Sequence, residues 1–213
     1  MYLPPHFKED RLEVLAELVR QHPFAVLVTL GAQGLVANHV PMLLDPQPAP
    51  WGTLRAHVAR ANPVWSTTRP EVEALAIFQG PHHYISPSWY PTKRETGMVV
   101  PTWNYAVVHA RGLLRPVDDA DWLRSHVTAL TRHMESGFAA PWSVTDAPAD
   151  FIEKMLKGIV GIEIRLTGME GKWKVSQNRT EPDRHGVVAA LREEEDAQSQ
   201  AMARLVEQRL PPR

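Results

Sequence analysis

The chain has 213 residues, 44% hydrophobic and 22% charged, which is enough to bury the core of one large domain. Its 23 basic and 24 acidic residues give a net charge of −1, so it lacks the basic footprint of a nucleic-acid binder and a polybasic membrane patch. The absence of cysteine excludes disulfides, zinc–thiolate sites, iron–sulfur clusters and thiol nucleophiles. The longest apolar run, residues 24–30, is too short to span a bilayer, and the first residues lack a signal-peptide pattern. We therefore expect a soluble, cytoplasmic protein.

The first third of the chain predicts one helix and three strands. Residues 8–21 carry leucines at helical spacing, and Pro23 ends that helix. The continuously apolar residues 24–30 predict a buried strand, and a glycine turn leads into a second strand over 35–44. Residues 53–58 alternate between apolar and polar side chains, which is typical of a third strand with one buried face.

The junction after this third strand has the pattern of an anion site. In Arg60-Ala-Asn62-Pro63, asparagine stands where a helix N-cap belongs and proline at the first helical position, which predicts a short helix over 63–68. The first N–H groups of a helix attract anions, and Arg60 lies just before them. An ordinary helix cap beside a surface arginine is the alternative.

The segments 78–90 and 100–105 combine aromatic side chains, prolines and hydroxyl groups, between strands predicted over 74–78 and 103–117. A regular core strand would exclude the prolines, and a disordered loop would not carry so many aromatic rings. The interspersed polar residues favour the wall of a rigid pocket for a flat, polar-edged small molecule over plain core packing. The aromatic residues are Trp89, Tyr90, Trp103 and Tyr105, and the polar ones are Ser86, Ser88, Thr102 and Asn104.

The second half of the chain predicts two helices, a hairpin and a terminal helix. The helices lie over 118–134 and 149–157, the second ending at Gly158. Residues 159–166 and 172–177 predict two strands joined by a turn at 168–171. The charged segment 187–210 predicts a helical arm, with residues 193–196 as a solvated acidic face. We divide the chain into a domain over 1–180 and an arm over 181–213.

These elements amount to six or seven strands with inserted helices, without the strand–helix alternation of a doubly wound sheet. They predict a mainly β fold, an antiparallel barrel with helical embellishments. The ten histidines have no local ligand spacing, and the adjacent pair His82-His83 points to opposite sides of an extended segment, so we predict no metal site. Lys93 and Arg94 are candidates for a phosphate contact or for simple solvation.

Six strings in chain order resemble the PaiB-type proteins, the "FMN-binding negative transcriptional regulators". They begin at Met1-Tyr-Leu-Pro-Pro-His-Phe7 and Ala37-Asn-His-Val-Pro41, and continue through His57-Val-Ala-Arg-Ala-Asn-Pro63 and Tyr84-Ile-Ser-Pro-Ser-Trp-Tyr90. The last two are Val100-Pro-Thr-Trp-Asn-Tyr105 and Gly171-Lys-Trp-Lys-Val-Ser-Gln-Asn178. The resemblance covers the chain from residue 1 to about 192.

The resemblance implies a split β-barrel of the FMN-binding type, with peripheral helices and a C-terminal helix, that forms a homodimer with flavin at the subunit interface. It implies a phosphate contact at His57, Arg60 and Asn62, because related barrels hold the phosphate near the turn after their third strand. Trp173, Ser176, Gln177 and Asn178 resemble the C-terminal element that completes the flavin pocket. Related barrels also bind haem, but no residue here stands out as an axial ligand.

Two functions from different classes follow. The first is an FMN-binding protein that acts as a redox regulator or a modest oxidoreductase, with Arg60, the aromatic wall and Asn104 or Gln177 binding the cofactor. No side chain stands out as a general acid or base. The alternative is a repressor that binds DNA directly without flavin chemistry, which the near-zero net charge disfavours.

Overall fold

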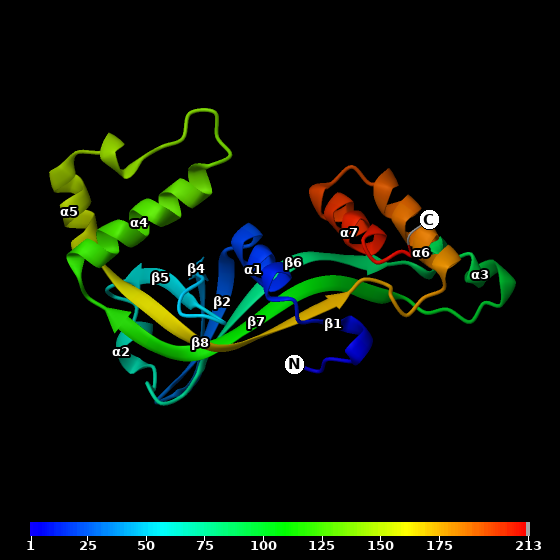
Figure 1. Ribbon diagram of the computed structural model, residues 1–213, viewed down its shortest axis with the longest axis horizontal. Helices are drawn as coiled ribbons and strands as arrows, with labels where there is room; N and C mark the ends of the chain where they lie inside the picture. Colours follow the sequence, from blue (N-terminus) through cyan, green and yellow to red (C-terminus); the bar gives the residue numbers. More distant parts are fainter. Residues whose placement is uncertain (212–213) are drawn as a thin grey trace. The chain divides into compact units, whose positions relative to one another are not determined.

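The computed structural model describes residues 1–211, whose strands form one mostly antiparallel sheet (Figure 1). Neighbouring strands follow the order β3-β2-β6-β7-β8-β5-β4, and β1 pairs with β8 outside this path. The strands are β1 (Lys8–Glu9), β2 (Phe24–Gly31), β3 (Gly34–Pro41), β4 (Leu43–Asp45), β5 (Thr53–Ala59), β6 (Ala74–Ile85), β7 (Thr102–Val117) and β8 (Ile159–Lys174).

The two ends of the strand path, β3 and β4, are consecutive in the chain and separated only by Met42. The single strand predicted over 35–44 is therefore two strands. Met42 is 1% exposed, and its backbone N–H donates to the carbonyl of Pro23 rather than to a strand partner. No ladder pairs β3 with β4 among the described residues, so the sheet is an open barrel.

Seven α-helices and three 3₁₀ turns accompany the described strands. The helices are α1 (Leu12–Gln21), α2 (Val64–Thr67), α3 (Thr92–Glu95), α4 (Ala120–Glu135), α5 (Ala149–Lys157), α6 (Glu181–Glu193) and α7 (Ala197–Glu207), and the turns are η1 (Pro5–Phe7), η2 (Pro87–Trp89) and η3 (Val144–Asp146). The mainly β prediction with peripheral helices is confirmed. No helix within residues 1–211 combines the length and apolar character needed to cross a membrane.

The chain divides into two compact units, which we describe separately. Unit 1 comprises Met1–Leu18, Gln79–Val108 and the chain from Glu170 onward, and unit 2 comprises Val19–Phe78 and His109–Met169. The long strands β6, β7 and β8 each contribute residues to both units.

Unit 2 contains β2 to β5, with the alternation expected for β5: Leu54, Ala56 and Val58 are buried, and Arg55 and His57 are half-buried. Its helices α4 and α5 form as predicted. The Asp119 side chain accepts the N–H of Trp122 at 2.7 Å and caps α4, and Gly158 follows the last residue of α5. A small apolar cluster joins α4, α5 and η3 through Leu123, Val144, Ile152 and Leu156.

The C-terminal segment belongs to the core of unit 1 and is not one continuous helix. It forms α6 and α7, which lie side by side (Figure 1). Their apolar residues share a buried cluster with Ile85, Tyr90 and Val175, so residues on both sides of the proposed boundary at 181 pack together. The division into a domain and an arm stays a prediction. The cluster members from α6 and α7 are Val187, Leu191, Met202, Ala203 and Val206.

The predicted hairpin at residues 168–171 is wrong, because β8 runs without a break from Ile159 to Lys174. Gly171 does not form a turn; its lack of a side chain allows α1 and β1 to pack closely against β8. A Cβ on Gly171 would collide with Leu15 of α1 and approach the carbonyl oxygen of Glu9 at 2.8 Å, so a larger residue would push α1 and β1 away from β8.

Candidate functional site

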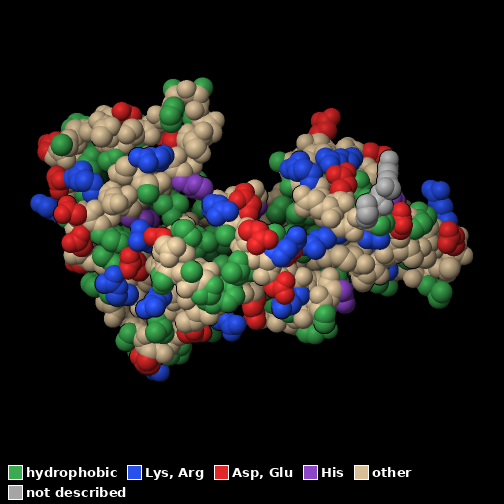
Figure 2. Space-filling view, in the orientation of Figure 1, with side chains coloured by type: hydrophobic (Ala, Val, Ile, Leu, Met, Phe, Trp, Pro, Cys, Tyr) green, Lys and Arg blue, Asp and Glu red, His purple; other side chains and the backbone are tan. Residues whose placement is uncertain are grey.

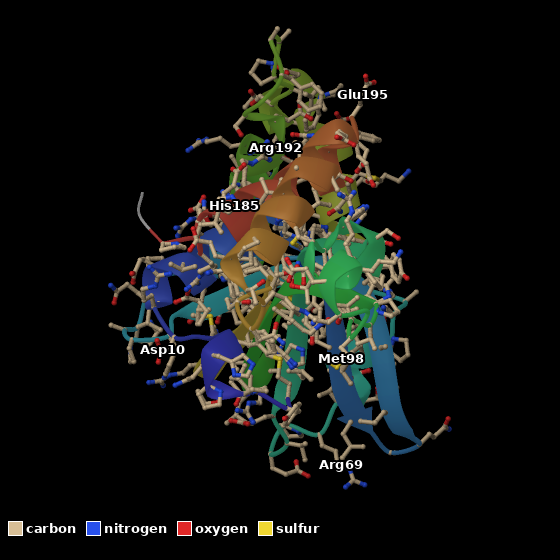
Figure 3. The ribbon with its side chains drawn as sticks, turned by 90° about the vertical axis from the view of Figure 1, so that its right-hand side faces the viewer. Asp10, Arg69, Met98, His185, Arg192 and Glu195 are labelled. Atoms are coloured by element: carbon tan, nitrogen blue, oxygen red, sulfur yellow. The ribbon has the colours of Figure 1, made fainter. Side chains whose placement is uncertain are left out.

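The face of unit 1 formed by the end of β6 and the start of β7 carries exposed aromatic rings. Trp103 is 53% and Tyr84 44% exposed, and their rings meet edge to face at 6.1 Å between centroids. The His82 ring lies 6.3 Å from that of Trp103. Met98, in the connection from α3 to β7, is also at the surface (Figure 3). Large aromatic side chains grouped on one exposed face make this region a candidate binding surface.

A small polar notch lies where β7 begins and β8 ends. It measures about 30 Å³ and is lined by Thr102, Asn104, Lys174, Ser176, Asn178 and Arg179. The Lys174 Nζ donates to Thr102 Oγ1 and to the backbone carbonyl of Trp103. The ammonium therefore lies beside the backbone of the residue that carries the exposed indole.

Asn104 is fully buried in the wall of this notch. Its Nδ2 donates to Ser176 Oγ at 2.9 Å, whereas its Oδ1 has no partner. Ser176 takes a left-handed backbone conformation with φ of 66°, rare for a residue with a side chain. A buried amide with one unpaired end is costly unless a ligand or water completes it.

The notch is electrostatically positive. Burial, followed by the charges of Lys172 and Arg179, lowers the pKa of Lys174. The Arg179 guanidinium lies 4.8 Å from the Tyr90 ring centroid, and Lys172 lies over the Tyr2 and Tyr105 rings. Within the described chain, no carboxylate forms an ion pair with any of these three cations, so their charge is available to an anion.

The other predicted site residues of unit 1 fall around this region in different roles. Ser86 accepts the N–H of Ser88 and begins η2, while Ser88 accepts from Lys93 Nζ at 2.9 Å. Trp89 is half-buried, with its ring 5.8 Å from that of His83. Trp173 is 4% exposed, and the Gln177 side chain accepts the N–H of Val175 and donates to the carbonyl of Trp173.

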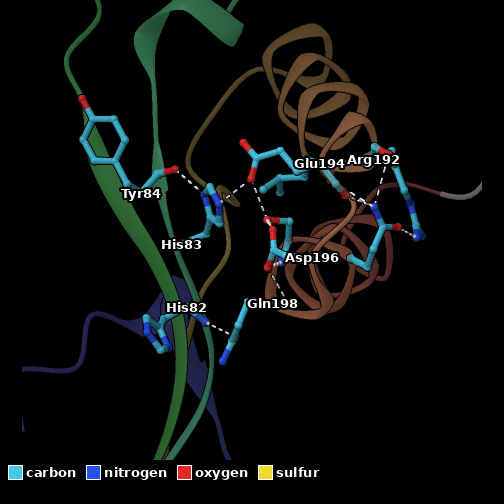
Figure 4. Close-up of polar contacts among 10 residues, drawn as sticks. His82, His83, Tyr84, Arg192, Glu194, Asp196 and Gln198 are labelled. Atoms are coloured by element: carbon cyan, nitrogen blue, oxygen red, sulfur yellow. Dashed lines mark hydrogen bonds and ion pairs between the residues drawn. The ribbon is translucent and has the colours of Figure 1, made fainter.

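His82 and His83 point to opposite sides, as expected for neighbours on a strand (Figure 4). His83 Nε2 lies 2.9 Å from Glu194 Oε2, and Nδ1 lies 2.5 Å from the carbonyl oxygen of Tyr84. Glu194 and Asp196 also contact Ser199, and Asp196 caps α7. The acidic block is solvent-exposed at Glu193, Glu195 and Asp196, as predicted, but it is not a helix face, because only Glu193 belongs to a helix. It ends one helix, begins the next and bonds the connection between them to β6.

In unit 2, the predicted anion junction is filled by the protein itself. The Arg60 guanidinium forms two hydrogen bonds of 2.8 and 2.6 Å with Asp118 and donates to the carbonyls of Lys157 and Ile159. Asn62 Nδ2 donates to Asn38 Oδ1, and Asn62 Oδ1 accepts the N–H of Val64, one residue later than the predicted cap. A phosphate at this junction would have to displace these partners. The assignment of His57, Arg60 and Asn62 to a phosphate stays a prediction.

In unit 2, the half-buried His57 contacts the buried His126. The rings of His57 and His126 meet edge to face with 5.3 Å between their centroids, and the Trp122 ring stacks on that of His126 at 5.1 Å. His126 is 4% exposed and neither of its ring nitrogens has a partner. Burial, with smaller contributions from His57 and Arg55, lowers the pKa of His126 to about 4, and burial also lowers the pKa of His57. Both rings are therefore neutral near pH 7.

The structure thus brings Thr102 and Asn104 together with Ser176 and Asn178, and Trp103 with the end of β6. It adds two residues to which sequence analysis gave no role, Lys174 and Arg179. The alternation Lys172-Trp-Lys174 with an arginine five residues on was the available signal, since every second residue of a strand shares a face. Among residues 1–211, no group of three or more histidine and acidic side chains could hold a metal ion.

The chain matches known proteins in sequence and in fold. Residues 1–168 match the family model described as "Putative FMN-binding domain". Protease synthase and sporulation protein PAI 2 of Bacillus subtilis (strain 168) is 34% identical over 210 residues, which cover 99% of this chain and 98% of that protein. The match extends past the family model to the C-terminal helices.

Two solved structures show the same fold at low identity. The FAD and heme binding protein from Mycobacterium smegmatis is 14% identical, with a TM-score of 0.57 over 78% of this chain and 73% of that chain. The flavocytochrome Anf3 from Azotobacter vinelandii is 8% identical, with a TM-score of 0.58 over 78% of this chain and 69% of that chain. The split-barrel prediction is confirmed, and with it the resemblance on which it rested. The chain belongs to the family of FMN-binding domains that includes the PaiB-type proteins, and FMN is its cofactor.

Proposed function

We propose that unit 1 binds FMN with its exposed aromatic face and its cationic notch, and that the protein is a cytoplasmic, flavin-dependent redox regulator or modest oxidoreductase. The observation that carries this proposal is the exposed indole of Trp103 beside a notch whose cations lack carboxylate partners. A flavin needs an apolar surface for its rings and donors for its carbonyl and phosphate oxygens. The unpaired end of buried Asn104 fits a site completed by a bound molecule.

The residues of this face have separate roles in the proposed complex. When bound, FMN supplies hydride or electron transfer. The Trp103 ring packs against the flat face of a ligand, with Tyr84 and His82 extending that surface. Lys174 and Arg179 supply positive charge at the end of the site, and Ser176 holds the Asn104 amide in place.

The regulatory part of the proposal draws on the name of the Bacillus relative, which refers to protease synthesis and sporulation. A direct repressor would need a large basic surface. On the face shown in Figure 2, basic side chains over α6 and α7 alternate with acidic ones, and α4 carries Asp121 and Glu135 as well as Arg124 and Arg132. Since clustered cations drive binding to duplex DNA, we favour regulation through flavin redox state or a partner protein.

FMN titration tests the proposal. We expect saturable binding with quenching of flavin and tryptophan fluorescence, because an indole within stacking distance of a flavin quenches it. Trp103→Ala removes an indole that is 53% exposed and so does not open the core. It should weaken FMN binding by about 1–2 kcal/mol and leave the melting temperature within a few degrees. Trp142→Ala, at an equally exposed tryptophan of unit 2, is the matched control and should bind FMN like the wild type.

A wild-type protein that neither binds FMN nor quenches its fluorescence would contradict the proposal. The same titration with duplex DNA distinguishes the flavin-binding protein from the alternative, a repressor that binds DNA directly. We expect weak DNA binding that salt abolishes, because few clustered cations are available to hold phosphates. Sequence-selective binding by the flavin-free protein that persists at high salt would favour the direct repressor.

We also propose that the protein is a homodimer. Strands β2 and β3 carry exposed apolar side chains, among them Phe24 at 63% and Leu35 at 77% exposure. Burying them against a second subunit would be favourable. Light scattering after size exclusion should give twice the chain mass of 24.0 kDa. A monomer at micromolar concentration would contradict this.

A further inference from the structure

The cations around Lys174 differ from several basic residues of unit 1 that pair with carboxylates. Arg11 and Arg209 pair with the buried carboxylate of Glu9, and Arg192 pairs with Glu207 at 2.7 Å. Lys172, Lys174 and Arg179 instead face carbonyl, hydroxyl and aromatic groups. Lys172 is buried, and Lys174 and Arg179 are half-buried, so an anion beside them would offset part of the cost of removing these charges from water.

We propose that the notch between β7 and β8 is a binding site for a phosphate monoester, and that it takes the phosphate of FMN. This inference rests on the proposed function and adds to it a location for the charged end of the cofactor. It assigns the phosphate to Lys174 and Arg179, two residues outside the predicted junction at Arg60.

The size of the notch and its donor groups fit this ligand. The unpaired Oδ1 of Asn104 is an acceptor, so it is not a contact of the phosphate. The notch volume of about 30 Å³ holds roughly two water-sized oxygen atoms, since one water requires about 10–15 Å³. The notch can therefore take two of the oxygen atoms of a phosphate group. The lining is almost entirely polar, and its donors come from three directions: Lys174 at the end of β8, Arg179 beyond the bend at Ser176, and the hydroxyl of Thr102 on β7.

The geometry holds these donors in place before any ligand arrives. The Ser176 carbonyl accepts the N–H of Arg179 at 3.0 Å, which turns the chain back over the end of β8. The Arg179 guanidinium rests on the ring of Tyr90, which is 1% exposed and part of the unit 1 core. The Lys174 ammonium is anchored by Thr102 and the Trp103 carbonyl, which leaves one of its three N–H groups for an anion. A preorganised cationic site loses little side-chain entropy on binding.

Electrostatics support the same assignment. The pKa of Lys174 is lowered by burial and, to a smaller extent, by the charges of Lys172 and Arg179. A phosphate dianion would oppose this effect and stabilise the two cations that line the notch, Lys174 and Arg179. Arg60 has the opposite environment, because its guanidinium already forms four hydrogen bonds with Asp118 and two backbone carbonyls.

The test compares FMN with riboflavin, which lacks the phosphate, on the wild type and on Lys174→Met, Arg179→Met and Arg60→Met. Methionine keeps the length of the side chain and removes the charge. We expect each of the two notch variants to raise the Kd for FMN at least about tenfold, with riboflavin unchanged within about twofold, because each removes one charge-assisted contact to phosphate. Arg60→Met should leave the ratio of the two Kd values unchanged. Circular dichroism melts establish that each variant is folded.

Inorganic phosphate and pyrophosphate form a second arm that does not depend on flavin. Both should compete with FMN on the wild type and should bind flavin-free wild-type protein, but not Lys174→Met, by calorimetry. Equal losses of FMN and riboflavin in the notch variants would overturn the assignment, since the notch would then contact the ring system. A selective loss of FMN in Arg60→Met alone would return the phosphate to the predicted junction.

Wild-type protein that binds neither flavin would overturn the proposed function and, with it, the assignment of the notch to FMN. Phosphate binding that depends on Lys174 in that same protein would support the anion site for a phosphate ester other than FMN. The two failures are therefore distinguishable.

Discussion

Acidification from pH 7 to pH 4 is expected to destabilise the folded protein by about 3 kcal/mol through His126 alone. The pKa of this histidine falls from its ordinary value of 6.5 to about 4 on folding, and each pKa unit corresponds to about 1.4 kcal/mol. The cause is burial without a polar partner, since His126 is 4% exposed and both of its ring nitrogens are unpaired. His57 and Arg55 add repulsion for a second positive charge.

The sign of the effect follows from which state binds the proton. Above pH 6.5 the histidine is neutral in both the folded and the unfolded chain and contributes no pH dependence. Between pH 6.5 and about 4 only the unfolded chain binds the proton, so the free energy of unfolding falls as the pH falls. Below about pH 4 both states are protonated and this contribution levels off. Glu163 does not reverse it. Burial alone would raise the pKa of Glu163, but hydrogen bonds from Arg115 and Trp122 lower it overall, so the stability that Glu163 contributes is also lost as the pH falls.

Urea unfolding at a series of pH values measures the free energy of unfolding as a function of pH. The variant His126→Phe isolates the contribution of the His126 ring. Phenylalanine keeps the aromatic stack with Trp122 and removes the titrating nitrogens, and a cavity of about 170 Å³ lined by His126 has room for its larger ring. The variant should match the wild type near pH 7 and lose much less stability at pH 4 to 5. His185→Gln, at an exposed histidine of α6, should retain the wild-type pH profile. A wild-type profile in His126→Phe would show that His126 is not the buried neutral group described above.

The predictions succeeded where a local signal determines the structure. Helix α5 begins and ends at the predicted residues because Gly158 stops it, and β5 has the predicted buried face because its residues alternate. The turn at residues 168–171 failed for a physical reason. Glycine signals a turn only when its freedom of backbone conformation is used, and Gly171 is instead required for the close approach of α1.

The candidate site could be predicted only in part, because it depends on contacts between distant segments. Thr102, Trp103 and Asn104 were identified from composition. Lys174 and Arg179 converge with them only because β7 pairs with β8 and because Ser176 bends the chain. At Arg60 the local sequence predicted an anion site that the structure does not leave free. The Arg60 guanidinium is paired with Asp118, more than fifty residues away in the chain. Local pattern alone does not determine whether a charged group is already paired.

Replacing Gly186 of α6 by alanine is expected to destabilise unit 1, although alanine is the better helix former. The change gains up to about 1 kcal/mol in helix propensity. However, a Cβ at this position would collide with the backbone carbonyl oxygen of Trp89 and lie 3.2 Å from Cδ of Pro91. Neither group is the flexible end of a side chain, so α6 would have to move away from η2. The packing of Val187 and Leu191 in the cluster with Tyr90 would then be lost in part, and we expect a net loss of about 1–3 kcal/mol.

This change also links the core of unit 1 to the proposed site. Arg179 rests on the Tyr90 ring, so a shift of the segment around η2 should weaken FMN binding as well as folding. Urea midpoints and FMN titration measure the two effects on the same variant. Gly168→Ala is the matched control, because no atom lies within 4 Å of its added Cβ, and it should match the wild type in both measurements. A Gly186→Ala protein as stable as the wild type would mean that α6 does not lie against η2 at this distance, and the anchoring of Arg179 through Tyr90 would lose its support.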